Sequence, residues 1–446
     1  MTDSIERITE KLSNTISRNG IDWNAFEAVL ASVEDINIFD NDDEETILSK
    51  LLVGCDFYHN GSLMPDIIRS FIQRGYNVHA NDGINGGLCL NQLCWSSYDQ
   101  YIIDAAKILL DAGAPIDYAS TDDDPNDEHS NVLDSISWKL LGLWNVDGDY
   151  AAANIFEAYY SMIMAVKNGK DYREISSYFD CISLKLDKVS ATVDDGEDRY
   201  WTEGKPIKYS GDLFLWFEGK PLKVSKYANL VIDPLQAKEK KDKAIDVTRD
   251  FTEVIGSRLI DVKFMDQFIC CFDFENGKRI VFSSFDLEEG NSVGFLEIRE
   301  IIHQINIEEL QVRQIGISKR KSHTDHAGHY SESSLALYTD EGCIIVFPIE
   351  KDETACNLDF ALCSEKAAFE YTRLLPIGIP KEIRRYDRDG KISAIRFRCE
   401  EGYLYLGTTA YTYNKIEILL SDEDFNPNEC PNFLGHSGKR MEFRLK

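Results

Sequence analysis

The stretch Phe268-Ile-Cys-Cys-Phe-Asp-Phe-Glu-Asn-Gly-Lys-Arg-Ile-Val-Phe-Ser, residues 268–283, indicates how the second half of this 446-residue chain folds. Apolar side chains recur at every second position from 268 to 274, which is the period of a β-strand. Asn276 and Gly277 separate this run from the apolar run at 280–282. An Asn-Gly pair between two such runs is a strong hairpin signal. The sequence therefore predicts antiparallel strands on either side of Gly277.

The same order of runs and turns occurs twice in the second half. Two segments that each contain a hairpin turn have counterparts further along: 213–222 matches 335–344, and 272–277 matches 397–402. The turn glycines lie 58 residues apart in the first set and 60 in the second. We therefore predict a mostly antiparallel β region made of two similar modules, at 182–310 and 311–446.

The first part of the chain, residues 1–181, has a helical period instead. Four segments, the last one weaker, each combine an apolar helical run with a turn and a short extended stretch: 26–42, 67–83, 105–119 and 160–172. Gly75, Gly113 and Gly169 fall where three of these helices must stop. Glycine suits the left-handed residue that ends a helix, so we expect helix C-caps there.

These helical segments resemble the ankyrin-repeat family over roughly residues 20–178. The run Ile108-Leu-Leu-Asp-Ala-Gly-Ala-Pro-Ile-Asp matches the second helix and outgoing turn of that family. The family's Thr-Pro-Leu-His signature is missing, and the turns recur every 38 to 56 residues rather than every 33 or so. The resemblance implies an α+β multidomain fold, with a degenerate ankyrin-like α-solenoid followed by the two β modules. It also implies a concave surface that binds another macromolecule.

The charge of the chain indicates what kind of partner to expect. The net charge is −29, and residues 1–181 hold 31 acidic against 11 basic side chains. Such a surface repels phosphate backbones, which argues against nucleic acid, and attracts a basic protein. The carboxylates of two acidic loops are the predicted partner contacts: Asp40, Asp42, Asp43, Glu44, Asp122, Asp123, Asp124, Asp127 and Glu128. We also expect a cytoplasmic protein outside the membrane, because a leader peptide and a run of about 20 apolar residues are both missing.

The sequence offers few candidates for catalytic or metal-binding residues. His323, His326 and His329 have a spacing that could bind a metal ion, but their polar surroundings favour an exposed loop, so we predict no metal and no cofactor. The sequence contains no nucleophile elbow and no phosphate-binding loop. Eleven cysteines without a Cys-x-x-Cys pair are predicted to be reduced core thiols. We expect Trp95, Trp138 and Trp144 to fill the core of the helical part.

Three functions are compatible with these patterns. The first is a non-enzymatic protein that captures a basic protein on its acidic surface, such as a bacterial immunity protein that neutralises a toxin. The hairpin pattern of the second half resembles small β modules of bacterial toxin–immunity proteins, which favours this hypothesis. The second is a hydrolase with its site in the β half and the repeats as a substrate adaptor. The third is a scaffold that joins two partners.

Overall fold

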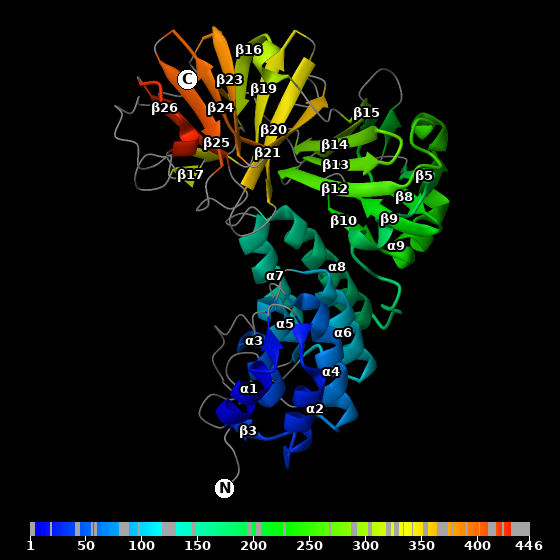
Figure 1. Ribbon diagram of the computed structural model, residues 1–446. Coiled ribbons are helices and arrows are strands. Elements are labelled where there is room, and N and C mark those ends of the chain that lie inside the picture. The colour runs from blue at the N-terminus through cyan, green and yellow to red at the C-terminus, as the bar shows by residue number, and fades with distance from the viewer. Residues whose placement is uncertain are drawn as a thin grey trace, which may run out of the picture. The chain divides into compact units, whose positions relative to one another are not determined.

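Helices fill the first part of the computed structural model and strands fill the rest (Figure 1). The chain divides into two compact units. The first comprises Met1–Leu143, Ala151–Asp180 and Leu230–Leu235, and the second comprises Trp144–Tyr150, Cys181–Asn229 and Gln236–Lys446. The structure describes residues 5–17, 20–40, 45–54, 57, 60–79, 89–96, 99–117, 131–144, 149–193, 199–201, 207–225, 229–266, 269–286, 292–301, 306–317, 323–324, 330–332, 334–340, 342–350, 356–363, 373–375, 378–388, 391–400, 402–408, 416–421 and 423–429.

The first unit is built mainly from helices. They are α1 (Ile5–Ser13), α2 (Trp23–Ala31), α3 (Ile47–Gly54), α4 (Met64–Gln73), α5 (Cys89–Ser96), α6 (Tyr101–Asp111), α7 (Val132–Gly142) and α8 (Tyr150–Lys167). Helix α3 packs against α1 and α5, α5 also packs against α7, and α4 packs against α6. In the described part of the chain, every helix is too short or too polar to cross a membrane.

Side chains and glycines at the helix ends explain where these helices start and stop. The carboxylate of Asp22 accepts a hydrogen bond from the Ala25 amide (3.1 Å) at the start of α2, and Asn131 accepts one from the Asp134 amide (2.9 Å) at the start of α7. Gly75, Gly113 and Gly169 have φ angles of 87°, 89° and 65°, two residues beyond α4, α6 and α8. The predicted glycine caps are therefore confirmed, because this backbone conformation strongly favours glycine.

The predicted fold class, with an ankyrin-like solenoid over residues 20–178, is nevertheless wrong. The helices are scattered among 3-10 turns and two-stranded pairs, such as β1 (Ile16–Ser17) with β2 (Gly20–Ile21) and β3 (Phe39–Asp40) with β4 (Glu45–Thr46). They form no clear ankyrin-like repeat. The described connections differ in local structure from one helix to the next, unlike the uniform units of an ankyrin array.

The second half of the chain is rich in strands, which form small antiparallel sheets. The first five-stranded sheet has the order β10 (Leu230–Ile232), β9 (Lys220–Val224), β8 (Leu213–Phe217), β5 (Leu186–Thr192), β11 (Ala244–Asp246). The first six-stranded sheet has the order β12 (Leu259–Asp266), β13 (Ile269–Phe274), β14 (Lys278–Asp286), β15 (Ser292–Glu300), β7 (Ile207–Tyr209), β6 (Tyr200–Trp201). The short helix α9 (Pro234–Glu239) lies between β10 and β11 in sequence.

Two further sheets follow with the same sizes. The second five-stranded sheet has the order β21 (Cys356–Cys363), β20 (Gly342–Glu350), β19 (Leu335–Thr339), β16 (Val312–Ile317), β22 (Arg373–Leu374). The second six-stranded sheet has the order β23 (Glu382–Arg388), β24 (Lys391–Arg398), β25 (Tyr403–Gly407), β26 (Ile416–Ser421), β18 (Tyr330–Glu332), β17 (His323–Thr324). Each strand from β5 to β15 has a counterpart from β16 to β26 at the same place in its sheet. We call β5–β15 the first module and β16–β26 the second module.

The core of the second module lies between its two sheets. Leu335, Leu337 and Ile344 from the five-stranded sheet pack with Ile395 and Phe397 from the six-stranded sheet. Because side chains alternate along a strand, the next residues of each strand point away from this core. The module is therefore a two-layer β-sandwich whose outer faces are available for other contacts.

The outer face of the first six-stranded sheet contacts the outer face of the second five-stranded sheet. Cys271 and Val281 pack there against Ile345 and Phe347. The Lys263 ammonium pairs with the Asp359 carboxylate of the second module at 2.9 Å. Burial lowers the pKa of Lys263, but the charges of Asp359 and Asp273 outweigh this effect and raise it, so the lysine stays charged.

A buried ion pair completes this contact. The Arg279 guanidinium donates to both carboxylate oxygens of Asp273, at 2.5 and 2.8 Å. Its remaining amino group donates to the carbonyl oxygen of Phe360 in the second module at 3.1 Å. We call this surface the docking face; it consists of Lys263, Met265, Cys271, Asp273, Arg279 and Val281. The docking face thus binds a protein surface through apolar packing and charged hydrogen bonds.

The described cysteines are buried free thiols, so we expect them to resist alkylation. They are Cys89, Cys94, Cys181, Cys270, Cys271, Cys343 and Cys399. Burial raises the pKa of Cys94 to about 12 and that of Cys399 to about 11, which suppresses the reactive thiolate at neutral pH. Iodoacetamide at pH 8 should leave all seven unmodified in the native protein and modify them in urea, as measured by peptide mass spectrometry. Rapid labelling of Cys270 or Cys271 in the native protein would contradict this burial.

Candidate protein-binding face

The acidic side chains predicted to contact a partner all lie outside the described part of the structure. Asp40 lies in β3, but its side chain is outside the described structure. The other eight predicted contacts, Asp42, Asp43, Glu44, Asp122, Asp123, Asp124, Asp127 and Glu128, lie outside the described residues. The structure therefore leaves this set as a prediction.

Most of the three-histidine cluster considered as a metal site also lies outside the described residues. The backbone of His323 lies in β17, whereas His326 and His329 lie outside the described residues. Within the described ranges, three or more His, Cys, Asp or Glu side chains never gather as a set that could hold a metal ion.

The described part of the first unit instead carries a row of exposed apolar side chains. Val53 is the seventh residue of α3, Trp95 the seventh of α5 and Trp138 the seventh of α7. Trp95 is 57% exposed and Trp138 56%, and Val53 is exposed too. Leu141, one helical turn after Trp138, is likewise exposed. We call Val53, Trp95, Trp138 and Leu141 the tryptophan row.

Hydrogen bonds between the starts of α3 and α5 align these two helices, and with them Val53 and Trp95. Thr46, just before α3, shares a hydrogen bond of 2.9 Å with the Tyr76 hydroxyl. That hydroxyl lies 3.0 Å from the Cys89 sulfur at the start of α5. Because both helices start at this network and pack side by side, Val53 and Trp95 lie at equal distances along them.

A cation–π contact connects the third helix to the row. The Lys139 ammonium lies 5.1 Å from the centre of the Trp95 ring, and α7 packs against α5. Lys139 is the neighbour of Trp138 in sequence. The row therefore continues from α5 to α7 and spans three adjacent helices.

The prediction that Trp95 and Trp138 fill the core is wrong. Helix α5 buries its other residues, Cys89 to Cys94 and Ser96, and leaves only Trp95 at the surface. The buried side of α5 contacts Tyr76 at Cys89 and Tyr159 at Leu90, whereas Trp95 lies outside this packing. Trp144 is partly buried, with its ring 5.7 Å from that of Tyr150. Aligning the sequence at the three helix starts, 47, 89 and 132, places both tryptophans at one position and could have revealed the row.

The chemistry of the row suits binding rather than proton transfer. Its four side chains have no group that titrates, and two of them are tryptophans, which bury a large rigid area at little cost in conformational entropy. Tryptophan is also strongly enriched among residues that dominate the binding energy of protein interfaces.

The chain matches no family model, and no curated protein is significantly similar to it.

Proposed function

We propose that the protein is a non-enzymatic binding protein that captures a basic protein partner with its first unit. The observation that carries this proposal is the tryptophan row, because exposed large apolar side chains gathered on adjacent helices are typical of protein-interaction surfaces. The row supplies the apolar anchors of such an interface.

The charge of the same part of the chain supports a basic partner. Residues 1–181 carry 20 more acidic than basic side chains. Carboxylates around an apolar centre speed association with a cationic protein, while the apolar anchors slow dissociation. Neutralisation of a basic toxin by an immunity protein is one form that such capture takes.

Affinity capture from a lysate of the native host tests the proposal. We compare the wild type with Trp95→Ala/Trp138→Ala and with Ile379→Ala, a matched control that removes an exposed apolar side chain from the second unit. The wild type and the control should retain the same basic protein. The double variant should bind it at least 30-fold more weakly, since each hot-spot residue contributes about 2 kcal/mol.

Salt provides the second measurement. Binding rates should fall steeply between 50 mM and 500 mM NaCl, because exposed charges are screened over about 10 Å at 0.1 M salt. The proposal fails if the captured protein is acidic, or if the double variant binds it as well as the control does.

A further inference from the structure

The second module carries a face that corresponds to the docking face but has different chemistry. In the first module Lys263 lies opposite Cys271, and Asp261 opposite Asp273, across β12 and β13. At the matching places of β23 and β24, Arg384 lies opposite Arg396, and Glu382 opposite Arg398. Tyr405 and Tyr403 on β25 lie opposite Arg396 and Arg398. We call Arg384, Arg396, Arg398, Tyr386, Tyr403 and Tyr405 the Arg–Tyr face.

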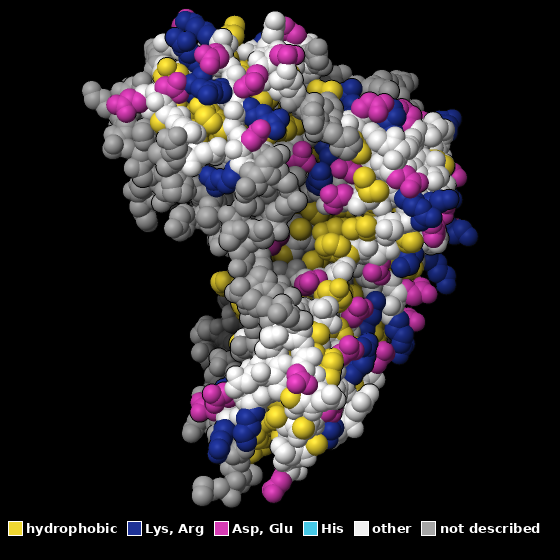
Figure 2. Space-filling model, viewed as in Figure 1, with side chains coloured by type: hydrophobic (Ala, Val, Ile, Leu, Met, Phe, Trp, Pro, Cys, Tyr) yellow, Lys and Arg dark blue, Asp and Glu magenta, His cyan; other side chains and the backbone are white. Residues whose placement is uncertain are grey.

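The chain as a whole has a net charge of −29, whereas the Arg–Tyr face contains three arginines. Lys and Arg side chains lie over β23 and β24 with acidic side chains between them (Figure 2). Arg384 and Arg398 are exposed, whereas the side chain of Arg396 is only 3% exposed. Two arginines directly opposite each other repel, so this arrangement needs nearby negative charge.

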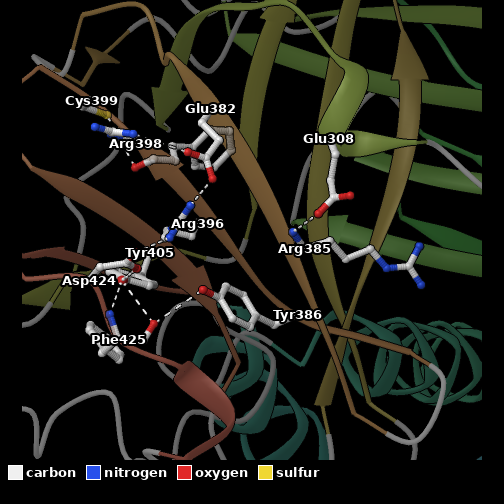
Figure 3. A network of polar contacts seen from close by, with 11 residues as sticks. Glu308, Glu382, Arg385, Tyr386, Arg396, Arg398, Cys399, Tyr405, Asp424 and Phe425 are labelled. Carbon is white, nitrogen blue, oxygen red and sulfur yellow. Dashed lines mark hydrogen bonds and ion pairs between the residues drawn. The ribbon is translucent and has the colours of Figure 1, made fainter.

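Arg396 is the centre of the polar network on this face. It lies between the carboxylates of Glu382 and Asp424 and forms ion pairs with both (Figure 3). Burial lowers the pKa of Arg396, but the hydrogen bond and charge of Asp424 outweigh burial and raise it. The Nε atom of Arg396 is buried without a hydrogen-bond partner, so the guanidinium keeps an unused donor.

A short segment of the chain itself lies on the Arg–Tyr face. Besides its pair with Arg396, the Asp424 carboxylate accepts a hydrogen bond from the Tyr405 hydroxyl at 3.0 Å. The Phe425 ring stacks on the Tyr405 ring, with centres 4.1 Å apart. The Phe425 amide donates to the Tyr405 oxygen at 2.8 Å, and the Asn428 side chain donates to the Asp387 carbonyl at 2.9 Å. We call residues 423–428 the strap.

We propose that the Arg–Tyr face binds an acidic–aromatic segment of a partner protein, in the place that the strap occupies. The strap shows the chemistry that the face selects: a carboxylate for Arg396 and Tyr405, and next to it an aromatic ring for Tyr405. The docking face supplies a second argument. There the matching surface of the first module binds a protein strand through a carboxylate, Asp359 on Lys263.

A protein segment fits this face better than a phosphate group does. The strap uses the main chain of Phe425 as well as a carboxylate, since the Tyr405 hydroxyl lies 3.2 Å from the Phe425 carbonyl oxygen. The stacked ring adds apolar area that a phosphate lacks. The strap also competes from within the same chain, at an effective concentration of the order of millimolar. A partner must therefore displace the strap, which makes the strap an inhibitory contact.

A labelled peptide copy of the strap tests this proposal. The probe is a fluorescein-labelled peptide with the sequence of residues 421–428, and binding to the full chain is followed by fluorescence anisotropy. The open variant, Asp424→Asn/Phe425→Ala, removes the ion pair and the stacked ring of the strap. It should bind the peptide at least tenfold more tightly than the wild type does.

Two arginine substitutions in the open variant test whether the peptide binds at the Arg–Tyr face. Arg396→Ala removes the partner of the strap carboxylate and should weaken peptide binding about tenfold, whereas Arg249→Ala, the same change at an exposed arginine of the first module, should leave it unchanged. If the double change impairs folding, as judged by circular dichroism, Asp424→Asn alone serves as the open variant. The proposal is overturned if opening the strap leaves affinity unchanged, if both arginine variants weaken binding equally, or if a 10-nucleotide single-stranded DNA binds the open variant more tightly than the peptide does.

Discussion

Replacing Arg279 by methionine should lower the free energy of unfolding by about 3–5 kcal/mol, because it leaves a buried carboxylate without its partner. The side chains of Arg279 and Asp273 are 4% and 5% exposed, and their pair is bidentate. Lys263 lies 3.4 Å from Asp273 and compensates for part of the loss, but it already pairs with Asp359. Chemical denaturation of the wild type and the variant measures the difference.

Two further variants separate the ion pair from a general effect of lost charge. Arg249→Met removes an arginine whose side chain is 82% exposed and should change stability by less than about 0.5 kcal/mol. Arg279→Met/Asp273→Leu removes both charges and should recover most of the loss, since a buried pair can be replaced by apolar residues at little cost. A single variant as stable as the wild type would show that Asp273 does not depend on Arg279.

The Arg279→Met variant also tests whether the docking face holds the two modules together. Arg279 belongs to the docking face and donates to Phe360 of the second module. If its loss separates the two modules, the outer face of a six-stranded sheet is a surface that holds protein by charged hydrogen bonds. The same place in the second module then has a precedent for binding a protein segment within this chain. Limited proteolysis of the wild type and the Arg279→Met variant measures this separation.

The strands of the second half were predictable because hairpin turns leave local signals. Gly277 has a φ of 79° in the turn between β13 and β14, as its Asn-Gly pair predicts. The docking face was not predictable from the alternation of the same strand. All six residues of β13 are buried, including Cys271 and Asp273, because both faces of this sheet are covered. Burial of the second face depends on a contact with residues about 80 positions away.

The tryptophan row and the Arg–Tyr face were still harder to predict, because both depend on contacts between residues far apart in sequence. Trp95 follows an apolar run and looks like a core residue in sequence, yet it is the residue of α5 that packing against α3, α6 and α7 leaves exposed. Arg384 and Arg396 are 12 positions apart, and only strand pairing brings them opposite each other. The strap contacts Arg396 through Asp424, which follows a different strand. The predicted acidic loops, by contrast, were chosen from composition alone, which says nothing about which side chains gather on one surface.

Replacing Gly294 by alanine should destabilise the first module by about 3 kcal/mol, the upper range for an overpacked core. A Cβ atom at this position would lie 2.2 Å from the Cζ atom of Tyr209, which pairs with Gly294 across β7 and β15. Tyr209 cannot easily move, because it is buried and its ring packs edge-on against Phe282. Adding Tyr209→Leu to Gly294→Ala should make the double variant more stable than the sum of the single effects predicts, because the ring that clashes is gone. Thermal denaturation of the four proteins completes this cycle, and purely additive effects would mean that Tyr209 is not what excludes a side chain at 294.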